Sequence, residues 1–170
     1  MKRILLIAAV LLSTLTGFAS RQSGSDGVSN LFWDFMYCKN AEYVHVPKLL
    51  LKLAAVAMDD EDKEDMKFLK RISSVRVLDL EECSEKIKRD FTERTKNFKA
   101  KGYEELVRQK SKDENTLVLI KMKKEYIREL VVITCDGEDC TLVQIKGKIH
   151  LDEVEDVIEH QGRNAKNKHT

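Results

Sequence analysis

The second half of the chain alternates between apolar and polar residues, and this period of two is the feature that most constrains the fold. Before about residue 100 the apolar residues recur at helical spacing, and from Tyr103 onward the period changes. Short turn sequences divide the alternating half, and Asp136–Asp139 is the clearest of them. Alternating segments joined by tight turns form an antiparallel meander. The predicted strands are Tyr103–Lys110, Thr116–Lys123, Tyr126–Cys135 and Cys140–Ile149.

One of these strands is apolar on both faces. Within Tyr126–Cys135, residues 130–133 read Leu-Val-Val-Ile, so successive side chains on opposite faces are all apolar. An antiparallel sheet usually packs one face against helices and leaves the other wetter. The second face of this sheet therefore needs a cover, and we expect the aromatic segment near residue 31 or a partner chain to supply it.

The first half of the chain predicts helices with two strands between them. Pro47 suits the first position of a helix, and the apolar residues after it recur at helical spacing, which predicts a buried helix over Pro47–Met58. An apolar stripe that begins at Cys83 predicts the longest helix, Glu82–Lys99, with Gly102 just past its end. Further predicted elements are a helix over Leu31–Cys38 capped by Ser29 or Asn30, strands over Ala41–Val46 and Ser74–Leu78, a short helix from the acidic run Asp59–Asp65 to Lys70, and a closing helix over Leu151–Glu159. The predicted fold class is α+β, with an antiparallel sheet packed against helices.

The N-terminus has the pattern of a cleavable secretory signal peptide. Lys2 and Arg3 precede the unbroken apolar run Ile4–Leu12, and Gly17 and Ala19 are small residues suited to cleavage before residue 20. An amphipathic or core helix is the alternative, but it would show polar residues at helical spacing inside the run. We therefore predict a signal peptide over residues 1–19, a flexible leader over 20–30, a single domain over 31–159 and a polar disordered tail over 160–170. The expected location is the periplasm or the cell envelope.

Charge and hydropathy argue against nucleic-acid binding and against a transmembrane helix in the mature chain. Cleavage after residue 19 takes Lys2 and Arg3 from the 30 basic residues, which stand against 29 acidic ones, so the mature chain is almost neutral. Such a balance offers no electrostatic footprint for nucleic acid. No stretch after the signal peptide has the roughly 20 apolar residues that a transmembrane helix needs.

Several short motifs together resemble a known family. The most specific are Val75-Arg76-Val77-Leu78, Tyr103-Glu104-Glu105-Leu106 and the closing Gly147-Lys148-Ile149-His150-Leu151-Asp152. In this order, from about Leu31 to Glu159, they resemble the bacterial domain-of-unknown-function family numbered 4252. The resemblance implies a small exported protein of the bacterial cell envelope. It implies no activity, and the four cysteines are not part of the pattern.

The cysteines predict one disulfide and leave a second open. Cys135 and Cys140 flank the turn Asp136–Asp139, which places them opposite each other in a hairpin, within reach of a disulfide bond. Such bonds persist in oxidising compartments. Cys38 and Cys83 are left over, and they either pair or remain free thiols, because connectivity cannot be read from sequence.

No catalytic, cofactor or metal motif rises above background. The acidic run from Asp59 has Glu64 where a Ca²⁺ loop needs Gly and Lys70 where it needs Glu, so it fits a solvated helix start better. No His lies at ligand spacing from Cys135 or Cys140, and none is positioned to activate a cysteine nucleophile. We therefore name no catalytic residue, no metal ligand and no cofactor.

The remaining candidates are the aromatic residues Phe32, Trp33, Phe35 and Tyr37, which either cap the core or cover a neighbour. The sequence favours a non-enzymatic protein that binds an unknown envelope protein or a second copy of itself. A small-ligand-binding module of the periplasm and a hydrolase are the alternatives. A flat exposed apolar patch would favour the first hypothesis, and a pocket lined by paired polar groups would favour the others.

Overall fold

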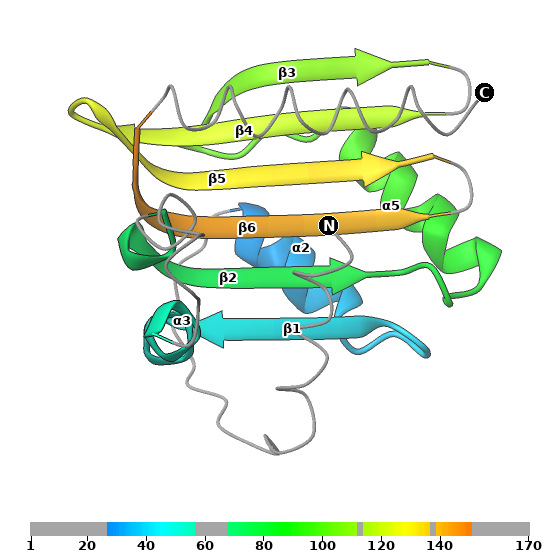
Figure 1. Ribbon diagram of the computed structural model, residues 1–170. Coiled ribbons are helices and arrows are strands. Elements are labelled where there is room, and N and C mark those ends of the chain that lie inside the picture. Colours follow the sequence, from blue (N-terminus) through cyan, green and yellow to red (C-terminus); the bar gives the residue numbers. More distant parts are fainter. Residues whose placement is uncertain (1–26, 57–67, 112–113, 137–138, 151–170) are drawn as a thin grey trace, which may run out of the picture.

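The computed structural model describes residues 27–56, 68–111, 114–136 and 139–150 (Figure 1). Three helices and six strands lie in these ranges. The helices are α2 (Gly27–Phe35), α3 (Lys48–Val56) and α5 (Glu85–Lys96), and residues 68–71 add a short helical turn. The strands are β1 (Glu42–Pro47), β2 (Ile72–Asp79), β3 (Glu104–Lys110), β4 (Asn115–Lys123), β5 (Tyr126–Cys135) and β6 (Cys140–Ile149).

All six strands form one antiparallel sheet with the order β1-β2-β6-β5-β4-β3. The predicted meander β3–β6 supplies four neighbouring strands, and β2 pairs with the free side of β6. The chain reaches β3 from β2 through α5, which crosses the sheet from the side of β2 toward the edge strand β3 (Figure 1). The predicted α+β class and the antiparallel sheet are confirmed.

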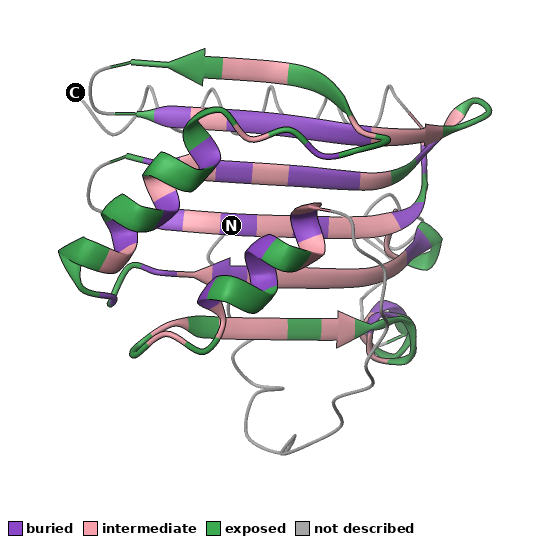
Figure 2. Ribbon diagram, turned by 180° about the vertical axis from the view of Figure 1, so that it is seen from behind, coloured by how far each residue is buried: buried purple, intermediate pink, exposed green. Residues whose placement is uncertain are grey.

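Helices α2 and α5 cover one face of the sheet, which we call the helical face (Figure 2). The core between them and the sheet holds Phe32, Phe91, Leu117 and Ile133, all nearly inaccessible to solvent. The strands contribute to it because their side chains alternate, so that residues 117, 119, 131, 133 and 142 share one face. The aromatic segment therefore packs on the same face as the long helix.

A second cluster lies on the opposite face. Its sheet residues include Val118, Ile120 and Leu130, which are about 5% exposed. Leu51 of α3, together with Phe68 and Leu69, joins this cluster at one end of the sheet. The second face is thus covered in part by α3 and the turn at 68–71, whereas the aromatic segment, one of the two expected covers, packs on the helical face.

The first half of the chain contains the differences from the predicted elements. Helix α2 begins at Gly27, so the first four of its residues fall in the segment predicted as leader. Pro47 closes β1, opposite Ser74, and does not begin a helix. α5 begins only at Glu85, so Cys83 lies before it, and Gly102 has a φ of 81° in a turn six residues after the helix ends. Glycine tolerates that φ, which is why its position signals a turn and not the helix terminus.

The predicted burial of the helix after Pro47 is wrong. Leu51 and Ala55 face the protein, but Leu49, Leu53 and Val56 are 68%, 58% and 81% exposed. The helix lies past the end of β1 instead of across the sheet (Figure 1). A helix that is apolar all round is expected to be buried, and this one presents only a single side to the sheet.

Gly147 lies closely against the backbone of residues 71 and 72, with no room for a side chain. A Cβ atom at this position would lie 2.8 Å from the carbonyl oxygen of Arg71 and 3.2 Å from Cα of Ile72. The register between β2 and β6 shifts beside this contact, between Ile72 and Ser74. We predict that Gly147→Ala lowers the free energy of unfolding by about 1–3 kcal/mol, because backbone atoms must move to admit the methyl group.

Urea denaturation of the variant beside Gly27→Ala measures this effect. The Cβ of residue 27 would meet its nearest neighbour, in Phe98, at an ordinary 3.4 Å, so that variant should be nearly neutral. Equal stability of both variants would contradict the packing assigned to Gly147.

Candidate functional site

The helical face carries polar groups at one end, apolar residues in the middle and the disulfide at the other end. Along β5 these groups are Glu129, then Val131 and Ile133, then Cys135. The antiparallel register sets Gln144 beside Val131 and Cys140 beside Cys135. We call Arg76, Tyr103, Glu129 and Gln144, which are joined by hydrogen bonds, the polar cluster.

Gln144 is the centre of the polar cluster and is 1% exposed. Its Oε1 accepts from the guanidinium of Arg76, with Nε at 2.8 Å, and its Nε2 donates to Glu129 Oε2 at 2.8 Å. The hydroxyl of Tyr103 donates to the same carboxylate oxygen at 2.6 Å. A buried amide is tolerated when its donors and its acceptor are used, and Gln144 meets this condition.

Basic groups surround the cluster. Lys121 and Lys146 lie 3.5 and 3.4 Å from the carboxylate of Glu129, and the guanidinium of Arg76 stacks on Phe32 of α2, 4.4 Å from the ring centroid. Arg76 also reaches the hydroxyl of Ser29 at 3.4 Å. The carboxylate of Glu129 is occupied by these donors, so it stabilises the cluster and is not placed to accept a proton from a substrate.

The sequence did not identify the polar cluster, because its members come from β2, β5, β6 and the residue before β3. Arg76 and Gln144 each look like an outward-facing polar residue in an alternating strand. The signal that could have found them is the pair of polar residues, Glu129 and Gln144, each beside an apolar residue within a central strand.

Cys135 and Cys140 form a disulfide, as the hairpin predicts, with their Cα atoms 4.2 Å apart. Both cysteines are buried, and the turn between them is closed by Asp136, whose carboxylate accepts from the backbone N–H of Asp139 at 2.8 Å. The hydroxyl of Thr92 on α5 lies 3.5 Å from Sγ of Cys140. The bond therefore joins two central strands directly below the long helix.

Cys38 and Cys83 are free thiols in this structure. Sγ of Cys83 lies 3.4 Å from the carbonyl oxygen of Lys39, next to Cys38 in the chain. Burial, with a smaller contribution from Cys38, raises the pKa of the Cys83 thiol. A thiol held in its protonated form is a weak nucleophile, which disfavours Cys83 as a catalytic residue.

The four aromatic candidates divide into two pairs. Phe32 and Phe35 are 1% and 7% exposed and belong to the core. Trp33 and Tyr37 are 44% and 71% exposed, and their ring centroids are 6.0 Å apart on the outer side of α2 and the turn that follows it. The helical period of α2 separates the two pairs, with residues 28, 31, 32 and 35 facing inward.

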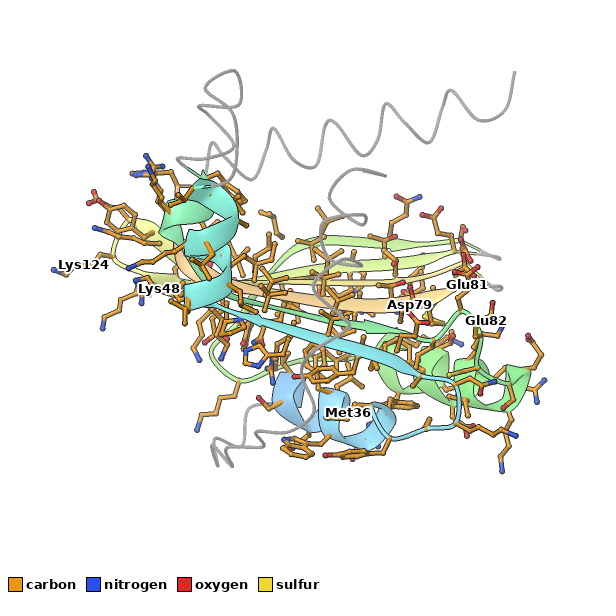
Figure 3. The ribbon with its side chains drawn as sticks, turned by 60° about the horizontal axis from the view of Figure 1, so that its bottom comes forward. Met36, Lys48, Asp79, Glu81, Glu82 and Lys124 are labelled. Carbon is orange, nitrogen blue, oxygen red and sulfur yellow. A yellow bond between two sulfur atoms is a disulfide. The ribbon has the colours of Figure 1, made fainter. Side chains whose placement is uncertain are left out.

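The two ends of the sheet differ in charge. Lys48 and Lys124 lie at the end that carries α3, whereas Asp79, Glu81 and Glu82 lie at the opposite end (Figure 3). Neighbouring Asp139 and Asp79 raise the pKa of the Glu81 carboxyl, as expected where like charges gather. The near-neutral total charge conceals this separation.

A family model described as a domain of unknown function, DUF4252, matches residues 35–157. The chain belongs to the DUF4252 family. All six strands of the sheet fall within the match, whereas Trp33 and most of α2 precede it. No curated protein and no solved structure matches the chain.

Some of the predicted features of this DUF4252 protein lie outside the described residues. They are the signal peptide, the acidic run Asp59–Asp65, the helix Leu151–Glu159 and the tail. Within the part that the structure describes, no three His, Cys, Asp or Glu side chains gather closely enough to hold a metal ion. In the same part, no helix is both long and apolar enough to cross a membrane.

Removal of the disulfide is predicted to lower stability moderately. The bond closes a short loop, with a sequence separation of five between its cysteines, so the entropy that it removes from the unfolded chain corresponds to about 2 kcal/mol. Urea denaturation of the Cys135→Ala/Cys140→Ala variant under non-reducing conditions measures the loss. Cys38→Ala, at a half-buried free thiol, is the control with the smaller effect. Non-reducing mass spectrometry that found four free thiols would contradict the bond.

His45 is predicted to titrate below its ordinary range. Burial, then the charges of Arg76 and Lys146, lower the pKa of the His45 imidazole. The unfolded chain therefore takes up this proton more readily, so stability is unaffected above the ordinary pKa of about 6.5 and falls as the pH drops below it. An NMR titration of the His45 ring should give a midpoint below that value, and Arg76→Gln should raise it. A wild-type midpoint at or above 6.5 would contradict the prediction.

Proposed function

We propose that this protein is an exported, non-enzymatic binding protein of the cell envelope that works by binding another protein. The observation that carries the proposal is the exposed apolar stripe of α3, formed by Leu49, Leu53 and Val56. These residues are spaced four and then three apart, so they line one side of the helix. Soluble monomers rarely expose contiguous apolar surface without a use for it.

The surroundings of the stripe indicate the kind of partner. Lys48 and Lys52 are exposed on the same helix, and Lys124 lies at the same end of the sheet (Figure 3). A partner that complements this end offers an apolar groove with acidic residues at its rim. Trp33 and Tyr37 form a second exposed patch, and tryptophan and tyrosine are the residue types most often found at the centre of binding surfaces.

Export is supported by the sequence of residues 1–19 and by the chemistry of the cysteines. The positive residues, the apolar run and the small residues at the cleavage position follow the order of a signal peptide. A disulfide between Cys135 and Cys140 suits an oxidising compartment, because cytosolic reductants keep most thiols reduced.

A hydrolase is disfavoured by the state of the candidate nucleophiles. Cys135 and Cys140 are bonded to each other, and the pKa of Cys83 is raised. The carboxylate of Glu129 is surrounded by four donors. The small-ligand alternative depends on a different region, a pocket that lies between α5 and the end of the sheet with the disulfide.

Site-specific photocrosslinking in the producing cell tests the proposal. We predict that a photoreactive residue at Leu53 gives one discrete adduct, and that Leu49→Glu in the same chain abolishes it, because a charge in the stripe opposes apolar contact. The control position is Lys86, which is exposed on α5.

The mass of the adduct separates the outcomes. An adduct with twice the mass of the chain identifies a second copy as the occupant and contradicts a different partner protein. Equal labelling from Leu53 and Lys86, or no adduct from either, would contradict the stripe as a binding surface. Retention of the unprocessed chain in the cytosol would contradict export.

A further inference from the structure

A pocket of about 390 Å³ lies between α5 and the end of the sheet that carries the disulfide. Asn115, Cys135 and Cys140 border it from the sheet, and Lys88 and Thr92 border it from the helix. Its volume is within the range of small-molecule sites, which begin at about 300 Å³.

The carboxamide of Asn115 is the unusual group in this pocket. Asn115 is 8% exposed, and neither its Nδ2 nor its Oδ1 has a hydrogen-bond partner. Within the described residues these are the only buried side-chain nitrogen or oxygen atoms left unpaired. A buried unpaired polar group is costly and calls for an explanation in a ligand, an ion or a water molecule.

Gln144 makes this exception clear, because it is a second buried amide on the same face of the same sheet. Its oxygen and its nitrogen both have protein partners, from Arg76 to Glu129. The fold therefore satisfies one carboxamide from within and leaves the other buried and unpaired in the wall of a pocket.

The chemistry of Asn115 selects the class of ligand. Its Nδ2 offers donors beside the acceptor Oδ1. A simple anion would use only the donors, and a simple cation only the acceptor. Another amide, which also presents a donor beside an acceptor, pairs with both atoms at once.

The rim of the pocket has charges of both signs. Lys88 and Lys96 are paired with Glu85 and Glu93 on α5, at 2.8 and 3.7 Å, and Lys110 donates to Asn97 at 3.1 Å. Glu114 lies beside Asn115 at the start of β4. Mixed charges suit a ligand with both a positive and a negative terminus.

We propose that this pocket binds a short peptide, whose backbone amide pairs with the carboxamide of Asn115 and whose charged termini meet the rim. The site is separate from the α3 stripe, so this proposal and the proposed function succeed or fail independently. The disulfide fixes the floor of the site, and Thr92, 3.5 Å from Cys140, fixes the helix above it.

NMR titration of the ¹⁵N-labelled protein with N-methylacetamide and with triglycine tests the proposal. Both probes should shift the side-chain NH₂ signals of Asn115 and the backbone signal of Thr92 in a saturable way, and triglycine should saturate at the lower concentration. The NH₂ signals of Gln144 should not move, since its amide is already paired. Acetate and methylammonium, which carry charge without an amide, are the matched control probes.

Asn115→Leu should abolish the shift of Thr92 and should raise the midpoint of thermal unfolding, because it replaces an unpaired buried amide with an apolar group of similar size. Asn115→Ala serves as the second variant if the leucine variant does not fold. No saturable shift with either amide probe up to about 50 mM, where weak sites fill, would overturn the proposal and leave water as the occupant. An equal response to acetate, or a lower unfolding midpoint in Asn115→Leu, would also overturn it.

Discussion

The structure depends on a sheet whose central strands are apolar on both faces. In β5, Val131 and Ile133 belong to the core under α2 and α5, while Leu130 joins the cluster on the opposite face. Because side chains alternate along a strand, a shift of register by one residue would exchange the two faces of β5. Both faces are apolar, so the exchange would not place a polar face against the helices. The register must therefore be fixed by something other than hydrophobicity alone.

Two features fix it. The disulfide joins Cys135 to Cys140 at one end of the β5–β6 pair, and the polar cluster joins Glu129 to Gln144 near the other. A slip of one residue would turn Glu129 and Gln144 away from Arg76 and Tyr103, and would leave buried polar groups without partners. The polar cluster thus gives the apolar sheet a single arrangement, which is sufficient to explain its presence without a catalytic role.

The sequence predicted the second half of the fold well because local rules govern it. The bounds of β5 and β6 are those that alternation and the turn after Cys135 predict, and the disulfide follows from the same hairpin. The first half depends on tertiary contacts. Pro47 pairs with Ser74 at the end of a strand, although the sequence after it is helical, and Cys83 belongs to the core without belonging to α5.

The candidate site was less predictable for the same reason. Phe32 and Phe35 could be assigned to the core or to a binding surface, and only the direction of α2 decides between these possibilities. The unpaired carboxamide of Asn115 has no signal in the sequence, since the residues of α5 that share its pocket lie 19 or more positions away. Alternation predicts the face of the sheet on which a side chain lies, but it does not predict which helix residues pack against that side chain.

The two edge strands of the sheet are protected against pairing with other chains, unlike the exposed apolar stripe of α3. β3 is an edge strand, and it carries Glu104, Glu105, Arg108 and Lys110, of which Arg108 also donates to the carbonyl oxygens of Lys96 and Phe98. The other edge, β1, ends at Pro47. Charged residues and proline are the usual means by which proteins prevent edge strands from pairing with other chains.

The charged residues of β3 and the proline of β1 therefore disfavour aggregation through the two edge strands. On α3, by contrast, Leu49 and Leu53 stand more than half exposed within a short distance of Lys48 and Lys52. Replacing either leucine with a polar residue would cost little in folding, because neither side chain contributes much to the core. A sequence that protects its sheet edges yet keeps this stripe apolar supports the proposal that another protein covers the stripe.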